Sequence, residues 1–263
     1  MRILPVHRDE HVKLPLVTAA PRRGGSFYDS PTTFQRYLDH RHSGVMSPNH
    51  VMEEPALLDA MGTVTGLRVL DLGCGDAAIG RTLLNAGCSS YLGLDGSAAM
   101  VEAASETLRG TSGRAEQVDM EDFAAPPSSF DLIVSRLALH YVEDFAAVLM
   151  ACHACLSPGG RIVFSVVHPV LSSYDAGTRE PRTNWIVDDY FLKGPRQRSW
   201  LGGSVTWFHR TVEDYVDALV NAGFALSALR ECAPREERFD GDLAELARRR
   251  RVPLFLLLSG TRI

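Results

Sequence analysis

The sequence predicts an α/β fold in which helices cover both faces of a parallel sheet. Two observations predict it. Between about residues 67 and 167, short β-branched runs alternate with segments of helical pattern, and a glycine-rich turn follows the first run. The chain has 263 residues, of which 45% are hydrophobic and 22% charged, so it has the length and composition to bury a sizeable core.

The expected strands of this sheet are short runs bounded by turn signals. They span 68–73, 90–95, 114–119, 130–136 and 161–167. Helices are expected in the gaps between strands. One helix spans 76–86, after the glycine turn. Another begins with Ser97 as its N-cap. A third spans 143–155 and ends before the Ser-Pro-Gly-Gly turn at 157–160.

The pattern breaks after residue 167. Residues 168–210 hold several prolines, glycines and aromatic rings, and they are too many for a plain connection, so we expect an insertion on the substrate side. The remaining expected elements lie on either side of this region in the sequence. They are a helix at 211–222, strands at 224–230 and 253–259, and two N-terminal helical segments at 32–40 and 51–61 that pack over the open end of the sheet.

Charge and composition exclude several classes of partner. A net charge of -5 and a pI near 6.0 argue against nucleic acid, which needs a basic face, so we expect a small partner. No apolar stretch approaches the ~18 residues of a membrane span. An odd count of 5 cysteines and an N-terminus without an apolar signal core favour a cytoplasmic protein with reduced thiols. Cys152 and Cys155 lack a second ligand pair, so no metal site is expected.

The glycine-rich turn contains Gly73 and Gly75 and formally matches the dinucleotide pattern G-x-G-x-x-A. Glycines let a ligand approach the backbone closely, and the following helix presents free N–H groups. Asp71 and Asp76, however, place carboxylates on both sides of the turn. They would repel a pyrophosphate and attract an ammonium or sulfonium group.

Two further acids end the next two strands. Asp95 lies about 20 residues beyond the glycine turn, where a carboxylate can accept hydrogen bonds from both ribose hydroxyls. Asp119 ends the third strand and is followed by Met120, so that one residue meets the adenine amine while the thioether packs on the ring. Together with Asp71, these acids describe a ligand with a nucleoside and a cationic tail.

The chain resembles class I S-adenosylmethionine-dependent methyltransferases of the small-molecule type. The resemblance covers about residues 67–164 and rests on five motifs in order: VLDLGCGDAAIG, YLGLDGSAAMVEAA, QVDMEDF, FDLIVSRLALHYVEDF and LSPGGRIVFSVVHP. It implies a Rossmann-like, seven-stranded, mostly parallel sheet with an antiparallel last hairpin. It also implies S-adenosylmethionine as cofactor and S-adenosylhomocysteine as product.

The resemblance implies one domain at 28–263 behind a flexible tail at 1–27, with a helical cap at 28–64 and a lid at 168–210. It also implies a set of residues that contact the cofactor. They are Asp71, Gly73 and Gly75 of the first motif, Asp95, Gly96, Ser97 and Met100 of the second, Asp119, Met120 and Glu121 of the third, Ser135, Arg136 and Leu137 of the fourth, and Tyr28, Tyr37 and Asn49 of the cap.

Methyl transfer from a sulfonium is a direct displacement, so the protein mainly excludes water and aligns the acceptor. His140, His168 and His209 are candidate general bases, and each could instead be a structural, hydrogen-bonded histidine. Aromatic residues are candidates for an apolar acceptor pocket, or for the core of the insertion itself. They are Tyr141, Tyr174, Trp185, Tyr190, Trp200 and Trp207.

The expected function is transfer of a methyl group to nitrogen or oxygen of a small molecule, in secondary metabolism such as antibiotic biosynthesis. Three alternatives stay open at this point: C-methylation on the same scaffold, a non-catalytic cofactor-binding module, and an NAD-dependent oxidoreductase. A homo-oligomer is compatible with the sequence, which does not name the acceptor.

Overall fold

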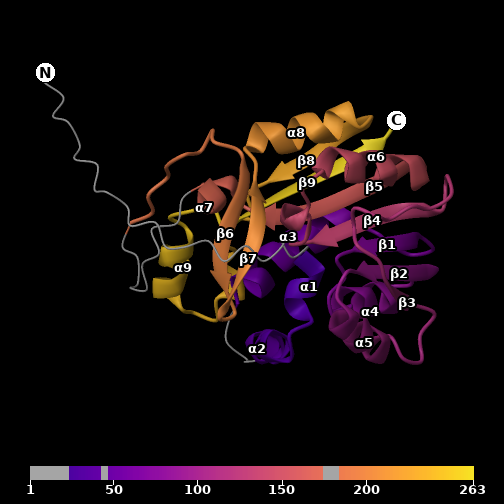
Figure 1. Cartoon of the computed structure of the whole chain (residues 1–263), viewed down its shortest axis with the longest axis horizontal. Helices are drawn as coiled ribbons and strands as arrows, with labels where there is room; N and C mark the ends of the chain where they lie inside the picture. Colours follow the sequence, from indigo (N-terminus) through magenta and orange to yellow (C-terminus); the bar gives the residue numbers. More distant parts are fainter. Residues whose placement is uncertain (1–23, 43–46, 174–183) are drawn as a thin grey trace, which may run out of the picture.

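The computed structural model describes residues 24–42, 47–173 and 184–263, and a seven-stranded sheet forms its centre (Figure 1). The strands follow the order β3-β2-β1-β4-β5-β9-β8. Their bounds are Arg68–Leu72 (β1), Ser90–Asp95 (β2), Arg114–Gln117 (β3), Phe130–Arg136 (β4), Leu156–Val167 (β5), Phe224–Arg230 (β8) and Phe255–Arg262 (β9). β9 pairs antiparallel with β5 and β8, and β1 to β5 are parallel. The predicted α/β, Rossmann-like class is confirmed.

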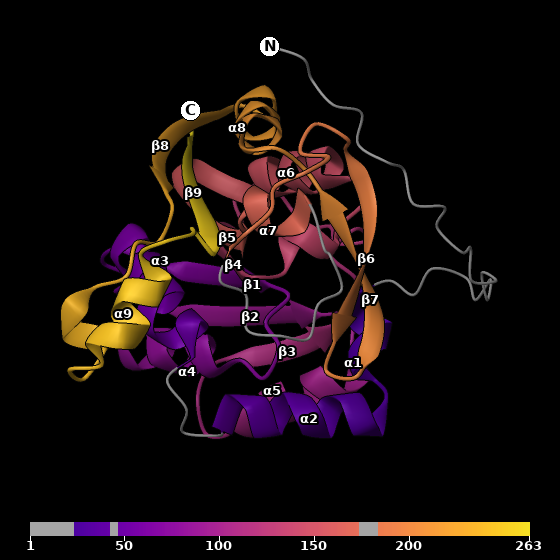
Figure 2. The ribbon, with the colours of Figure 1, turned by 90° about the vertical axis from the view of Figure 1, so that its left-hand side faces the viewer.

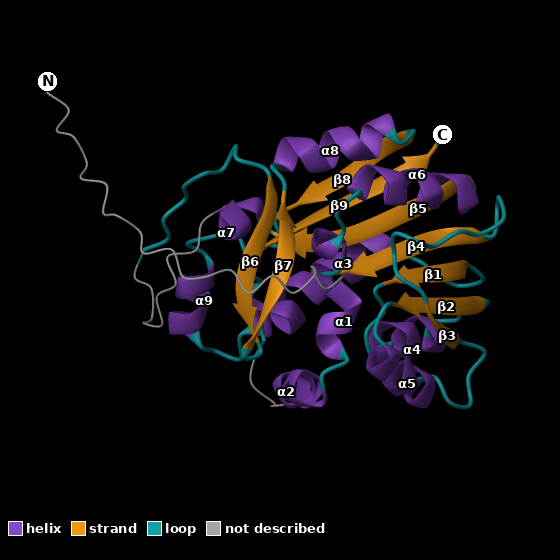
Figure 3. Ribbon diagram, in the orientation of Figure 1, coloured by secondary structure: helices purple, strands orange, loops and turns teal. Residues whose placement is uncertain are grey.

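Helices cover both faces of this sheet (Figure 3). They are α3 (Glu54–Met61), α4 (Ala78–Asn85), α5 (Ala98–Thr107), α6 (Phe145–Cys155), α8 (Val212–Asn221) and α9 (Leu243–Arg249). Side chains alternate along each strand, so neighbours enter different cores. Leu132 of β4 packs with α3 and α4, whereas the next residue, Ile133, packs with α6 and α8.

Most expected elements lie within a few residues of their predicted bounds. Ser97 caps α5, since its Oγ accepts the Met100 N–H at 3.2 Å. Thr211 and Asp214 form a capping box at the start of α8. Asp242 caps α9, a helix that the sequence analysis did not predict and that ends among the arginines at 248–251.

The insertion after β5 is more regular than its composition suggests. It contains α7 (Pro169–Ser173) and an antiparallel hairpin of β6 (Gly194–Trp200) and β7 (Gly203–His209). Leu201 and Gly202 have φ of 46° and 77°, which is typical of the two-residue turns that suit a twisted hairpin. Figures 1 and 2 place this hairpin beyond the end of the sheet toward which the parallel strands point.

The N-terminal segments lie at the same end of the molecule. They are α1 (Gly24–Tyr28), α2 (Pro31–His42) and a π-helical turn, η1 (Asn49–Glu53), that runs into α3. The expected tail at 1–27 is therefore too long by four residues, because residues 24–27 belong to α1 and Phe27 is buried. A Cβ on Gly25 would lie 2.6 Å from the Gly96 carbonyl carbon, so glycine allows α1 to rest on the loop after β2. Residues 1–23 lie outside the described part of the chain.

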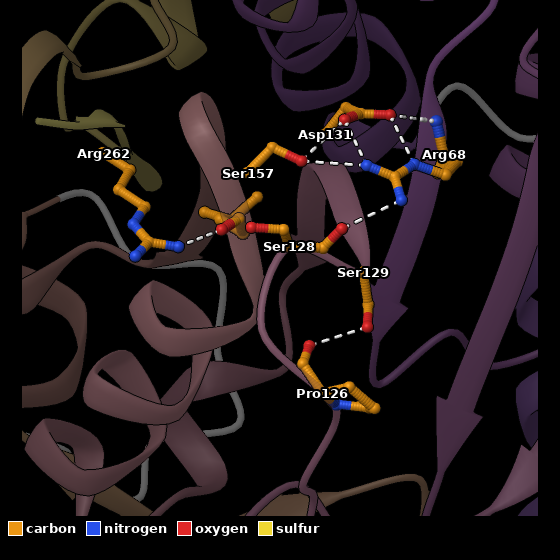
Figure 4. Close-up of polar contacts among 8 residues, drawn as sticks. Arg68, Pro126, Ser128, Ser129, Asp131, Ser157 and Arg262 are labelled. Carbon is orange, nitrogen blue, oxygen red and sulfur yellow. Dashed lines mark hydrogen bonds and ion pairs between the residues drawn. The ribbon is translucent and has the colours of Figure 1, made fainter.

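A polar cluster ties three strands together at the opposite end of the sheet (Figure 4). Arg68 of β1 donates to Asp131 of β4 from Nε at 2.9 Å and from Nη2 at 2.8 Å, and Ser157 of β5 donates to the same carboxylate at 3.0 Å. The Arg68 guanidinium holds the pKa of Asp131 well below its ordinary value. Among the described helices, none has both the length and the apolar character to cross a membrane.

We expect Gly80→Ala to destabilise the fold. A Cβ at this position of α4 would lie 2.6 Å from Cε1 of the Tyr91 ring, which is fully buried, so the ring must shift. Overpacking of this kind costs roughly 1–3 kcal/mol, and the helix propensity gained from alanine offsets about 1 kcal/mol of it. The net loss in the free energy of unfolding, up to about 2 kcal/mol, should appear in urea denaturation.

Thr82→Ala, at an exposed position of the same helix, is the control and should change stability by no more than about 0.5 kcal/mol. Equal stabilities for Gly80→Ala and the unmodified protein would show that Tyr91 adapts freely.

Candidate cofactor and acceptor site

A cavity of about 420 Å³ opens at the carboxyl ends of the parallel strands, where ligands of open α/β sheets bind. The turns after β1, β2, β3 and β4 line one part of it. The N-terminal segments, the β6–β7 hairpin and the ends of β5 and β9 line the rest. A second, smaller cavity of about 50 Å³ shares Tyr37, Gly73, Gly75 and Arg136 with the first.

The glycine turn adopts a backbone that requires its glycines. Gly73 and Gly75 have φ of 72° and 54°, and a Cβ on Gly73 would overlap the side chain of Ala138. Both glycines line the two cavities. Asp76 lines the smaller one and accepts the Ala78 N–H at 3.3 Å, at the start of α4.

Asp71 lies beneath this turn and is fully buried. Its Oδ2 accepts the Tyr91 hydroxyl at 2.6 Å, and its Oδ1 has no hydrogen-bond partner among the described residues. Burial raises the pKa of Asp71 to about 7, and the nearby carboxylates of Asp95 and Asp76 add to the shift. A buried carboxylate oxygen without a partner at the edge of the smaller cavity suits the ammonium group of an amino-acid tail.

Asp95 lines the main cavity and also organises two turns. Its Oδ2 accepts the Gly75 N–H and its Oδ1 accepts the Ser97 N–H, each at 2.9 Å. Burial raises the pKa of Asp95, and these two N–H groups oppose the shift. The Ser97 side chain does not line the cavity; it caps α5 and donates to Asp29 at 2.7 Å, and its expected contact with the cofactor stays a prediction.

The turn after β3 lines the cavity beside the β2 turn. Met100, Asp119, Met120 and Glu121 all line it, as does Gly96, whose missing Cβ leaves room for the Asp119 carboxylate. Glu121 accepts the N–H groups of residues 143 and 144, at 2.8 and 3.2 Å, and thereby fixes the approach to α6.

At the end of β4, three neighbouring residues have different roles. Ser135 is fully buried, donates to the Leu72 carbonyl at 2.7 Å and does not line the cavity, and its expected contact with the cofactor stays a prediction. Arg136 and Leu137 both line it. Leu137 has a φ of 53° and donates its N–H to the Ser165 carbonyl at 3.0 Å.

Arg136 forms a buried ion pair that the sequence did not reveal. It contacts Glu53 at 2.6 Å and Glu54 at 2.8 Å, and Ser165 donates to the same Glu53 carboxylate at 2.6 Å. Burial raises the pKa of Glu53, and the Arg136 guanidinium opposes that shift. The available signal was an acidic pair inside an otherwise apolar helical segment.

The expected cap residues Tyr28, Tyr37 and Asn49 all line the cavity. The hydroxyls of Tyr28 and Tyr141 lie 3.1 Å apart. The sequence analysis did not identify several other lining residues of the N-terminal segments, although a Gly-Gly pair is a signal for close backbone approach. They are Gly24, Gly25, Ser47 and Pro48.

The three candidate histidines differ in their surroundings. His140, in the 3₁₀ turn η2 (Leu139–Tyr141), lines the cavity, is 4% exposed, and has no hydrogen-bond partner at Nδ1 among the described residues. Burial, with Arg210 nearby, lowers the pKa of His140 to about 3. His168 binds Glu231 at 3.1 Å and accepts the Val170 N–H at 3.2 Å.

His209 lies 2.7 Å from the Ser172 hydroxyl and 2.8 Å from the Tyr190 carbonyl oxygen. Neither His168 nor His209 lines the cavity, so both have the structural role that the sequence analysis left open.

The aromatic candidates divide in the same way. Tyr141, Trp200 and Trp207 line the cavity. Trp185 instead donates to the Val170 carbonyl at 2.8 Å, and Tyr190 packs against Phe191 and His209. Both are partly buried and contact other residues of the insertion. Tyr174 lies outside the described residues.

The sequence analysis missed a group of apolar lining residues from later elements. They are Val142, Val167, Leu171, Leu254 and Phe255, together with Ala138. Within the described ranges, no group of three or more His, Cys, Asp or Glu residues is arranged to hold a metal ion.

Comparisons with known proteins agree with this geometry. A family model described as a methyltransferase domain matches residues 70–162. The crystal structure of an S-adenosylmethionine-dependent methyltransferase from Mesorhizobium loti is 37% identical with a TM-score of 0.73, covering 84% of this chain and 99% of that one.

Two sequence relatives extend the comparison. A protein of uncharacterised function from Haemophilus influenzae is 30% identical over 218 residues, which cover 78% of this chain and 85% of that protein. A ubiquinone biosynthesis O-methyltransferase from Pseudomonas syringae is 32% identical over 114 residues, but the match spans only 42% of this chain and 49% of the enzyme. With the strand-end acids around the glycine turn, these similarities show that the chain belongs to the class I S-adenosylmethionine-dependent methyltransferases, whose cofactor is S-adenosylmethionine.

Proposed function

We propose that the protein transfers the methyl group of S-adenosylmethionine to an oxygen or nitrogen atom of a small metabolite. One observation supports this most directly: a single cavity joins the strand-end acids and glycine turn to apolar side chains of later elements, among them Val167, Leu171 and Trp207. A cofactor and an organic acceptor can therefore meet inside the protein. The acidic net charge of -5 favours a small acceptor over nucleic acid.

In this proposal, the strand-end residues hold the cofactor. Asp71 binds the ammonium group, Asp95 binds the ribose hydroxyls, and Asp119 with Met120 binds the adenine. The bound cofactor supplies an electrophilic methyl group: the carbon–sulfur bond breaks, its electron pair stays on sulfur, and the acceptor atom loses a proton as it gains the methyl. The protein contributes alignment and exclusion of water.

An oxygen acceptor is supported by the partial similarity to the ubiquinone biosynthesis O-methyltransferase. C-methylation and cofactor binding without turnover are the alternatives. The deciding experiment incubates the protein with S-adenosylmethionine carrying a ¹³C-methyl group and a fractionated extract of small metabolites, and then locates the label by NMR. Label on oxygen or nitrogen supports the proposal, and label on carbon, or bound cofactor without any transfer, contradicts it.

Asp95→Ala should weaken binding of S-adenosylmethionine at least tenfold. The variant loses the proposed bonds to the ribose and also the acceptor of the Gly75 and Ser97 N–H groups, and hydrogen bonds to a charged group are worth about 1.5–3 kcal/mol each. Isothermal titration calorimetry measures the affinity. Glu102→Ala, which removes an exposed acid from α5, is the matched control and should bind normally. Near-normal affinity of the Asp95 variant would remove this residue from the site.

Cofactor affinity should fall as the pH drops below about 7. In the free protein the pKa of Asp71 is about 7, so below that pH the carboxyl holds a proton that it must release before it can pair with an ammonium group. Each unit below pH 7 should therefore cost up to about tenfold in affinity. Calorimetry at pH 5, 6 and 7, in two buffers of different ionisation enthalpy, measures both the affinity and the released proton.

Asp71→Asn keeps the shape of the side chain and cannot titrate. Its affinity should be lower at pH 7 and should vary less with pH than that of the unmodified protein. The same pH dependence in both proteins would assign the effect to a different group, such as Asp95 or Asp76.

A further inference from the structure

The cavity is divided by charge. Its charged lining side chains, Asp95, Asp119, Glu121 and Arg136, come from β2, the turn after β3, and the end of β4. From η2 onward, no described lining residue is Asp, Glu, Lys or Arg. This second part, which we call the apolar end, is lined by Val142, Val167, Leu171, Trp207, Leu254 and Phe255, beside His140.

His140 brings a polar atom to the apolar end. Its Nδ1 is buried and has no hydrogen-bond partner among the described residues. Buried polar atoms are normally paired, and an unpaired one in a ligand cavity marks the place where a ligand supplies the partner. The next residue, Tyr141, differs from His140 because its hydroxyl already has a neighbour, the hydroxyl of Tyr28.

The ring of His140 is held in a fixed orientation. It packs edge-to-face on Trp207 at 5.1 Å and lies 4.4 Å from the Tyr141 ring, as centroid distances. Arg210 is engaged elsewhere: it donates to the carbonyls of Val142 at 2.8 Å and Glu143 at 2.6 Å. With that cation near and the site buried, the imidazole stays neutral, so His140 offers a hydrogen bond and no charge.

We propose that the methyl acceptor is an uncharged, largely apolar molecule whose accepting hydroxyl or neutral amine donates a hydrogen bond to Nδ1 of His140. This inference rests on the proposed function and names its substrate class. A carboxylate would lose its hydration at the apolar end, and the arginines near it are already engaged: Arg136 pairs with Glu53, and Arg210 donates to backbone carbonyls. An ammonium group has no electron pair to receive a methyl. With a hydroxyl acceptor, the proton of the oxygen passes to His140 as the new bond to carbon forms, and from there to solvent. A methylated amine keeps its proton until the product reaches solvent.

The weak basicity of His140 is sufficient for this step. An oxygen that has gained a methyl while keeping its proton is a far stronger acid than the starting hydroxyl. Even an imidazole whose conjugate acid has a pKa of about 3 can take that proton. His140 therefore has little ability to deprotonate a free hydroxyl in advance, and its main role is to orient one.

The test uses matched naphthalene probes and calorimetry in the presence of saturating S-adenosylhomocysteine. The probes are 2-naphthol, its anionic counterpart 2-naphthoate and the cation 2-naphthylmethylammonium. We expect 2-naphthol to bind at least tenfold more tightly than either ion. His140→Phe keeps an aromatic ring and should reduce 2-naphthol affinity about 3- to 10-fold, the effect of one neutral hydrogen bond, with unchanged affinity for S-adenosylhomocysteine.

His153→Phe is the matched control, since His153 is a partly buried histidine of α6 that does not line the cavity. It should bind every probe as the unmodified protein does. Equal or tighter binding of either ion, no binding of 2-naphthol, or an unchanged 2-naphthol affinity in His140→Phe would overturn the substrate class. Failure to bind S-adenosylhomocysteine at all would instead count against the proposed function.

Discussion

The buried ion pair between Arg136 and Glu53 joins the N-terminal segments that cover the site to the strand ends beneath them. The Arg136 side chain is 12% exposed and that of Glu53 is 0% exposed, and Ser165 of β5 donates to the same carboxylate. One contact thus joins the N-terminal segment to the ends of β4 and β5. Removing one partner of such a pair typically costs about 3–5 kcal/mol, because the other charge stays buried and unpaired. The position of Asn49 over the strand ends depends on this pair, since Arg136 also donates to its carbonyl at 3.0 Å.

The separation of charge within the cavity follows from the sheet order. β1, β2 and β3 are adjacent, and each ends close to an acid, so the carboxylates gather on one side of the sheet. β5 and β9 lie on the other side and contribute Val167 and Phe255, which are paired in register. Trp207 of the hairpin packs on His140. A cationic, polar ligand and an apolar one are therefore accommodated at different ends of one cavity.

Local patterns were sufficient to predict the sheet and the strand-end acids, because these depend on periodicity and spacing over about 20 residues. Ser135 and His168 show the limit of that reasoning: each lies at the correct edge, but side chains alternate between faces, and theirs bind neighbouring groups instead of facing the cavity. Glu53 and Arg136 are 83 residues apart, so no local pattern indicates their pairing. The β6–β7 hairpin was missed because polar residues fill its exposed positions and glycines and prolines flank it.

Two perturbed groups of the site, Asp71 and His140, share one physical cause with opposite consequences. Burial disfavours charge, so it raises the pKa of the Asp71 acid to about 7 and lowers the pKa of the His140 base to about 3. A cation that binds beside Asp71 favours its ionised form, whereas the same positive charge further disfavours protonation of His140. Binding of a cationic cofactor would thus ionise the polar end and keep the apolar end neutral. The same burial thus acts on an acid at one end and on a base at the other, and the neighbouring charges add to each shift.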